Sequence, residues 1–179
     1  ETALANFLAS GLLRLGPKLG PILWQFPPNM AFDPDLFENF LALLPQDRDA
    51  AEALAKRHDG HVKGRAWLRS DGDQPIRHAL EIRHNSFRSP AFIEMLRRHN
   101  VALVCADTVE WPLLMDITAD FIYCRLHGSE QLYVSGYEDE ALDLWAERIR
   151  AWATGGEPKN ATRVLAPLDD HVTLPLQLP

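Results

Sequence analysis

The chain is poor in cysteine, with only Cys105 and Cys124 among its 179 residues. Neither has a second cysteine at the spacing of a CxxC motif, which argues against a cysteine zinc site or a local redox pair. Each lies in an apolar stretch typical of a strand, where cysteine packs as a small hydrophobic residue. We therefore expect two buried free thiols in a reducing compartment.

Segments that direct a protein to a membrane or out of the cell are also missing. No stretch reaches the ~18 apolar residues of a membrane span. The chain does not open with a cationic region, an apolar run and a cleavage site. We therefore expect a cytoplasmic protein with no membrane partner. Because the chain starts at Glu1 with helical periodicity at once, we also expect that natural sequence precedes it.

An excess of positive charge is absent, since the formal net charge is -7. A surface that gathers nucleic acid needs a basic face, so a nucleic-acid partner is not expected. A local group of arginines could still hold one small anion. The hydrophobic content of 46% with 24% charged residues is that of a globular domain and excludes a disordered chain.

Apolar periodicity predicts strands that alternate with helices. Strands are predicted at residues 22–26, 79–84, 101–107 and 121–127, and helices at 2–15, 33–44, 47–58, 90–99 and 138–153. This order is typical of an α/β fold with a parallel sheet and helices packed outside it. Residues 157–179 contain four prolines and no clear element, so we expect an irregular C-terminal tail.

Polar side chains gather where the predicted strands end. In a parallel α/β sheet the carboxyl ends of the strands meet at one edge, and reactive residues collect there. Residues two apart on a strand share a face, which places Glu81 with Arg83 and Arg125 with His127. The sequence predicts a site of residues from all four strand ends: Gln25, Glu81, Arg83, His84, Asp107, Arg125 and His127.

Two interpretations of these residues compete. In the first, Arg83 and Arg125 bind a phosphate or carboxylate, Glu81 and His127 transfer protons, and Asp107 orients His127. Gln25, His84 and Tyr137 would add substrate contacts in that case. In the second, the same residues form a structural network, in which Glu81 pairs with an arginine and His127 donates to Asp107 or to a backbone carbonyl.

A metal or cofactor is not predicted. The sequence has no HExxH or HxH spacing, so no metal ligands are assigned, and no cofactor can be identified. Three functions stay open. They are an enzyme that acts on a small anionic substrate, phosphorylated or sugar-like, a non-catalytic binding or interaction protein, and a metal-dependent, nuclease-like barrel.

Four ordered segments resemble the YecE-like family, known as domain of unknown function 72. Gly20–Pro28 resembles its LGPxLxQxPP segment, and Ala79–Phe87 resembles its LExRHxSW strand. Ala119–Gly128 resembles its ADFxYxRLHG strand, and Tyr137 with the helix around Trp145 resembles the pattern that follows. The resemblance covers about residues 1–155. Asn85 stands where the family has proline.

The resemblance implies a TIM-barrel-like fold of parallel β/α units, but it supplies no reaction. The family's first barrel strands and its vYxxFNN strand have no counterpart here, so the resemblance implies an incomplete barrel. Residues 1–156 are expected to form this partial barrel domain, followed by the tail at 157–179. Open sheet edges would favour self-association.

Overall fold

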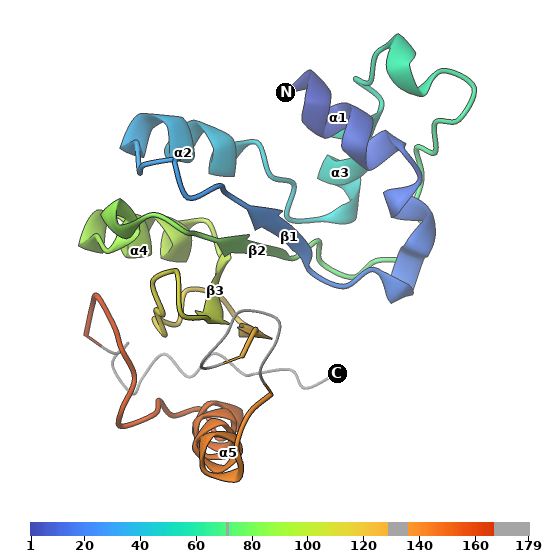
Figure 1. Cartoon of the computed structure of the whole chain (residues 1–179). Coiled ribbons are helices and arrows are strands. Elements are labelled where there is room, and N and C mark those ends of the chain that lie inside the picture. The colour runs from blue at the N-terminus through green and yellow to red at the C-terminus, as the bar shows by residue number, and fades with distance from the viewer. Residues whose placement is uncertain (71, 129–135, 167–179) are drawn as a thin grey trace. The chain divides into compact units, whose positions relative to one another are not determined.

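The computed structural model describes residues 1–70, 72–128 and 136–166 (Figure 1). Strands and helices alternate along much of the chain, as the apolar periodicity predicts. The helices are α1 (Thr2–Ala9), α2 (Pro34–Ala42), α3 (Arg48–Ala55), α4 (Pro90–Arg98) and α5 (Asp139–Ala153), with short 3-10 helices η1 (Leu12–Lys18), η2 (Gly60–Val62) and η3 (Asn85–Phe87). The strands are β1 (Ile22–Gln25), β2 (His78–Glu81), β3 (Ala102–Asp107) and β4 (Tyr123–Leu126).

The strands form one parallel sheet in the order β1-β2-β3-β4. Ala79 of β2 lies opposite Ala102 of β3, and Ala106 of β3 lies opposite Arg125 of β4. Strands in chain order with helical crossovers are the arrangement of consecutive β/α units in a barrel. The predicted α/β fold of parallel units is confirmed.

Capping residues explain where the helices begin. The Asp33 carboxylate accepts a hydrogen bond from the Leu36 N–H at 3.1 Å, next to Pro34 in the first turn. Asp47 likewise accepts from the Ala50 N–H at 2.8 Å and caps α3. Each carboxylate satisfies a backbone donor that the first helical turn leaves without a partner.

The first helix is shorter than predicted. We expected residues 2–15, but α1 ends at Ala9 and 3-10 turns follow. Gly11 has φ 109°, a left-handed conformation that glycine adopts without steric cost and that ends a helix. The periodicity continues past this point because the 3-10 turns still bury Leu13.

The chain divides into two compact units, and the first comprises residues 1–22 and 39–78. In this unit α1 and α3 pack side by side and bury small apolar residues such as Ala5 and Ala51 (Figure 1). The backbone N–H of Trp67 donates to the Ala9 carbonyl at 2.8 Å. This bond attaches the loop between η2 and β2 to the end of α1.

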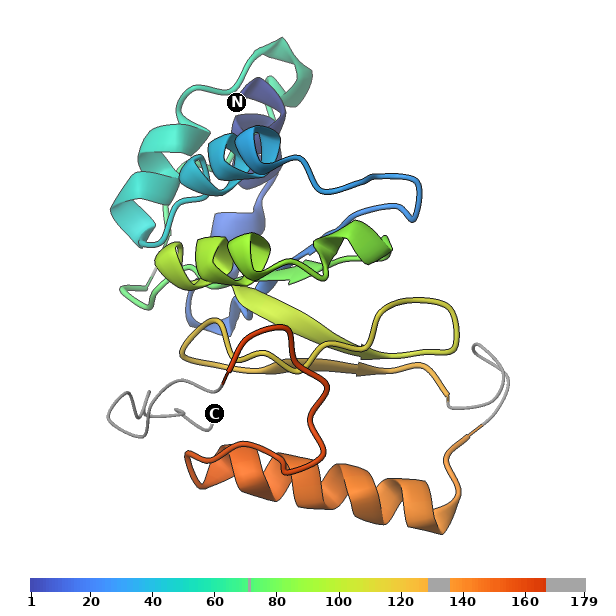
Figure 2. The same cartoon turned by 90° about the vertical axis from the view of Figure 1, so that its left-hand side faces the viewer.

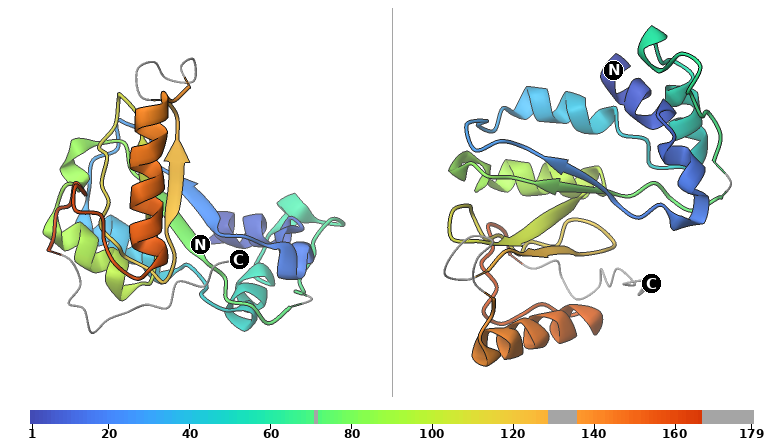
Figure 3. Two further views of the ribbon diagram at one scale, coloured as in Figure 1. Left: turned by 90° about the horizontal axis from the view of Figure 1, so that it is seen from below. Right: turned by 45° about the vertical axis from the view of Figure 1, so that its right-hand side comes forward.

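The second unit comprises residues 23–38 and 79–179. It contains most of the sheet, and α5 lies alongside β3 and β4 (Figures 2 and 3). One face of the sheet buries small residues such as Ala102 and Ala106 against Phe121. The other face packs Cys105 and Met115 against tryptophans of α5. The two faces therefore differ in what they bury, as the alternation along each strand requires.

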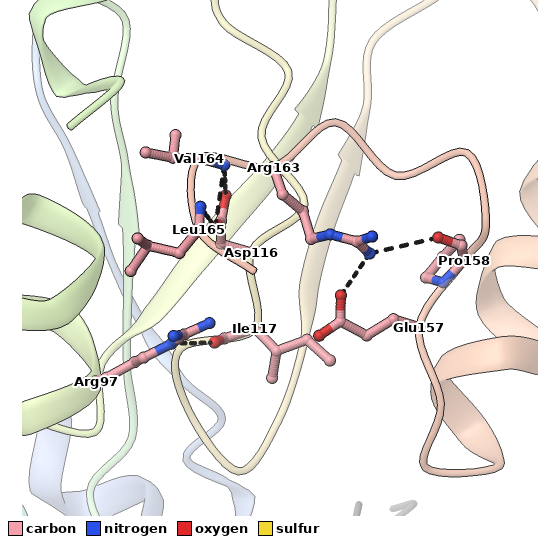
Figure 4. Close-up of polar contacts among 8 residues, drawn as sticks. All are labelled: Arg97, Asp116, Ile117, Glu157, Pro158, Arg163, Val164 and Leu165. Carbon is pink, nitrogen blue, oxygen red and sulfur yellow. Dashed lines mark hydrogen bonds and ion pairs between the residues drawn. The ribbon is translucent and has the colours of Figure 1, made fainter. Parts of the chain in front are cut away.

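A buried carboxylate holds part of the C-terminal segment in place. Asp116 accepts hydrogen bonds from the N–H groups of Val164 and Leu165 at 2.9 Å each (Figure 4). The Met115 N–H also donates to the Thr162 carbonyl at 2.8 Å. Residues 157–166 contain no helix or strand, and the division of the chain at residue 156 stays a prediction.

No helix in the described part of the chain has the length and apolar character needed to cross a membrane.

Candidate functional site

Glu81 is the centre of a polar cluster at the carboxyl ends of β1, β2 and β4. It is the last residue of β2 and is fully buried. Its Oε1 accepts from Gln25 Nε2 at 3.1 Å and from Arg83 Nε at 3.1 Å, and its Oε2 accepts from Arg125 Nη1. Parallel strands bring these ends together, so the structure unites four of the residues that the sequence singled out.

Trp111 and His127 extend this group. The Arg83 guanidinium lies over the Trp111 ring at 4.0 Å, a distance typical of a cation–π contact. The His127 ring meets Trp111 edge-on, with 6.2 Å between ring centroids. We call the six residues Gln25, Glu81, Arg83, Trp111, Arg125 and His127 the arginine cluster.

The charge state of the cluster follows from these contacts. Burial acts to raise the pKa of Glu81, but hydrogen bonds from Arg125, Gln25 and Arg83 outweigh it and lower that pKa below its ordinary value. Glu81 is therefore ionised at neutral pH. One carboxylate against two guanidinium groups (-1 + 2) leaves the cluster with a net charge of +1, in a chain whose net charge is -7.

His127 is held in the neutral form. Only 8% of its surface is exposed, and burial, followed by the nearby positive charge of Arg125, lowers its pKa. Glu81 and Asp107 act in the opposite direction without reversing the shift. A neutral imidazole can accept a proton, so His127 has the protonation state that a general base requires.

Asp107 lies at the same end of the sheet, but its carboxylate points to the other face. It accepts from the Tyr137 hydroxyl at 2.9 Å and from Trp145 Nε1 at 2.8 Å. We expected Asp107 to orient the His127 ring. The hydrogen bond that joins these two residues is instead a backbone one, from the His127 N–H to the Asp107 carbonyl at 3.0 Å.

The strand register explains this correction. Ala106 lies opposite Arg125, so Ala106 shares a face with the arginine cluster and Asp107 does not. Tyr137 joins Asp107 on that second face, where its hydroxyl also accepts from the Gly128 N–H at 3.3 Å. Burial, together with the bond to Asp107, raises the pKa of Tyr137 to about 12, so the phenol stays protonated and keeps donating.

His84 has a local contact instead of a place in the cluster. Its Nδ1 accepts from the Ser86 N–H at 3.2 Å and so caps the η3 turn after β2. The same nitrogen lies 2.8 Å from the Ser86 hydroxyl.

Trp111 is the member of the cluster that the sequence did not place in the site. It lies in the loop that follows β3. One signal could have identified Trp111. Its loop follows the carboxyl end of β3, the edge of the sheet at which Arg83 and Arg125 were predicted to lie.

Metal ligands do not assemble in the described part of the chain. Residues 1–70, 72–128 and 136–166 contain no group of three or more His, Cys, Asp or Glu side chains placed to hold a metal ion.

Comparisons with known proteins give the following matches. The model of the family described as "Protein of unknown function DUF72" matches residues 1–168. The fold is similar to the crystal structure of a DUF72 family protein from Thermotoga maritima, with a TM-score of 0.51 and 20% identity over 77% of this chain. The match covers 48% of that protein, so this chain spans about half its length, as expected for an incomplete barrel. A search of the curated proteins found no match.

Proposed function

Since the chain belongs to the DUF72 family, whose description assigns no activity, we propose a function from the arginine cluster: the chain binds a small anionic molecule, phosphorylated or sugar-like, through Arg83 and Arg125. The observation that carries this proposal is that one buried, ionised carboxylate holds both guanidinium groups at the ends of parallel strands.

The hydrogen-bond inventory supports anion binding. A guanidinium group has five N–H donors. Arg125 donates one of them to Glu81. Arg83 donates its Nε–H, and its Nη2 forms an ion pair with the same carboxylate at 3.0 Å. Among the described residues the remaining donors of both side chains have no acceptor within the chain, and both side chains are partly exposed, at 20% and 26%. Phosphate and carboxylate oxygens match this fork of donors.

Preorganisation is a second argument. Glu81 fixes one side of each guanidinium, and the Trp111 ring lies against the guanidinium of Arg83. Because the side chains are already held, a ligand would not have to bear the entropy of ordering them. Glu81 has the role of a positioning residue here, since its low pKa and its bonds to three partners make it a poor proton donor.

In a catalytic version of this proposal, His127 transfers the proton. It is neutral and mostly buried, and through Trp111 it is adjacent to Arg83. The alternative is a non-catalytic binding protein that uses the same arginines. One observation favours this alternative. Glu81 accepts hydrogen bonds from Gln25, Arg83 and Arg125 and is a poor proton donor, so His127 is the one member of the cluster suited to proton transfer.

Titration calorimetry with inorganic phosphate, and separately with a sugar phosphate, tests the proposal. Arg125→Ala should weaken binding at least tenfold, because a charge-assisted pair of hydrogen bonds is lost. Arg150→Ala, which removes an exposed arginine of α5, is the matched control and should bind as the parent does. Arg125→Lys keeps the charge without the fork and covers the case in which the alanine variant does not fold.

Equal phosphate affinity in the parent chain, Arg125→Ala and Arg125→Lys would refute the anion site. The same titration, followed by the NMR signals of the His127 ring, separates the two versions. A bound phosphate that raises the pKa of His127 places this ring at the ligand, whereas an unchanged ring supports binding without proton transfer.

A further inference from the structure

The two cysteines, far apart in the sequence, are neighbours in the sheet. Cys105 of β3 and Cys124 of β4 are register partners on adjacent parallel strands, and both are free thiols. Their side chains lie on the same face, in the cluster formed with Trp145 and Trp152 of α5. Adjacent strands lie ~4.8 Å apart. Disulfide-bonded cysteines have Cα atoms roughly 4.4–6.8 Å apart. The register therefore brings the two residues within bonding range.

The positive charge of Arg148 acts on both cysteines. The Arg148 guanidinium lies over the Trp145 ring at 4.6 Å, and its buried Nε–H has no hydrogen-bond acceptor among the described residues. A cation in this position stabilises a thiolate, which is the nucleophilic form of cysteine.

The two thiols are not equivalent. The hydrogen bond between them, then burial, raises the pKa of Cys105, whereas the same hydrogen bond, then the charge of Arg148 against the effect of burial, lowers the pKa of Cys124. Cys124 is also the more exposed of the two, since Cys105 retains only 2% of its surface. A half-buried thiol with a lowered pKa beside a buried thiol with a raised pKa is the arrangement expected of an attacking and a resolving cysteine.

We propose that Cys105 and Cys124 form a peroxide-reactive dithiol that closes to a disulfide between β3 and β4. The Cys124 thiolate attacks one oxygen of hydrogen peroxide, the O–O bond breaks, and hydroxide leaves and takes up a proton to become water. The Cys105 sulfur then attacks the sulfenic sulfur of Cys124, the S–O bond breaks, and a second water leaves with the thiol proton. Two thiols lose two electrons, and one peroxide gains them.

This modification site is independent of the proposed anion site. The cysteines lie on the α5 face of the sheet, opposite to the arginine cluster, and the oxidation requires neither Arg83 nor Arg125. The simpler alternative is that both cysteines only fill space against the α5 tryptophans, in which case the thiols would be inert.

Hydrogen peroxide, added in stoichiometric amount to the full chain at low protein concentration, tests the proposal. We expect loss of both thiols, measured in denaturant, and a linked pair of peptides in non-reducing mass spectrometry. Cleavage at Glu110, which lies between the two cysteines, makes the linkage visible. Retention of both thiols, or disulfides only between different molecules, would overturn the proposal.

The single variants test the assigned roles. Cys105→Ser should stop at a sulfenic acid on Cys124, trapped by dimedone, at about the parent rate. Cys124→Ser should react at least about tenfold more slowly than the parent, because the remaining thiol is buried and protonated. Equal rates for the two variants would contradict the assignment of Cys124 as the attacking cysteine.

Discussion

Two carboxylates at the same end of the sheet have very different surroundings. Glu81, at the end of β2, accepts from two guanidinium groups and one amide. Asp107, at the end of β3, accepts from a phenol and an indole. Both side chains have fixed partners, but the donors of Glu81 include two that are charged and the donors of Asp107 are neutral.

This difference separates a site from a structural contact. A guanidinium retains N–H groups after it binds a carboxylate, and these can hold a ligand. The indole of Trp145 has one N–H, and the phenol of Tyr137 has one O–H, so Asp107 uses up both donors. The Glu81 face can therefore bind an anion, whereas the Asp107 face attaches α5 and the chain at Gly128 to β3.

Removing each carboxylate tests this comparison and should give the largest effect. Glu81→Ala leaves two partly buried arginines without their counter-charge, so we expect the free energy of unfolding to fall by about 3–5 kcal/mol. Asp107→Ala leaves two neutral donors without a partner and should cost about 1–3 kcal/mol. Urea denaturation measures both.

Asp143→Ala, which removes an exposed carboxylate of α5, is the control and should stay within about 0.5 kcal/mol of the parent. The comparison fails if Asp107→Ala is as destabilising as Glu81→Ala.

Acid should weaken the Glu81 contacts. Its pKa is lower in the folded state than in the unfolded chain, where glutamate titrates near ~4.3, so the unfolded state binds the proton first. The stabilisation is therefore complete above that value and is lost as the pH falls through the lower folded pKa. We expect the parent's unfolding free energy to decline below about pH 4.

The variant Glu81→Gln isolates this contribution, since it keeps the side-chain shape and cannot ionise. Denaturation curves from pH 6 to pH 3 should give a shallower decline for the variant than for the parent. Parallel curves would mean that Glu81 does not stabilise the fold through its charge.

The smallest effect is expected on the Asp107 face. Tyr137→Phe removes the hydroxyl that donates to Asp107 and accepts from the Gly128 N–H. Because neutral hydrogen bonds contribute about 1 kcal/mol each, we expect a loss of about 1–2 kcal/mol and unchanged phosphate binding. Tyr123→Phe is the matched control, since the Tyr123 hydroxyl has no hydrogen bond within the described part of the chain. A large loss of phosphate affinity in Tyr137→Phe would show that the two faces are not separate.

Much of the fold could be predicted from the sequence because the signals are local. The apolar run at residues 22–26, ended by two prolines, and the Asp33-Pro34 start of a helix each depend on neighbouring residues alone. The error in the first helix arose because Gly11 can adopt left-handed and right-handed conformations equally well, and periodicity cannot tell which one the chain takes.

The site could be predicted only in part. Alternation placed Glu81 with Arg83, and parallel strands placed both near Arg125, as the structure shows. The sequence correctly placed Asp107 at the end of β3 and so assigned it to the same group. It could not show that the Asp107 side chain points to the α5 face of the sheet. Only the register between neighbouring strands decides which residues of one strand share a face with which residues of the next.

By itself the sequence determined the alternation of strands and helices and the set of polar residues at the strand ends, because backbone geometry and apolar periodicity act over a few residues. Only the tertiary structure decided which strand lies beside which, and in what register. That pairing sets the partners of Glu81, moves Asp107 to the α5 face, and brings Cys105 next to Cys124, because hydrogen bonds between strands join residues that the chain keeps far apart.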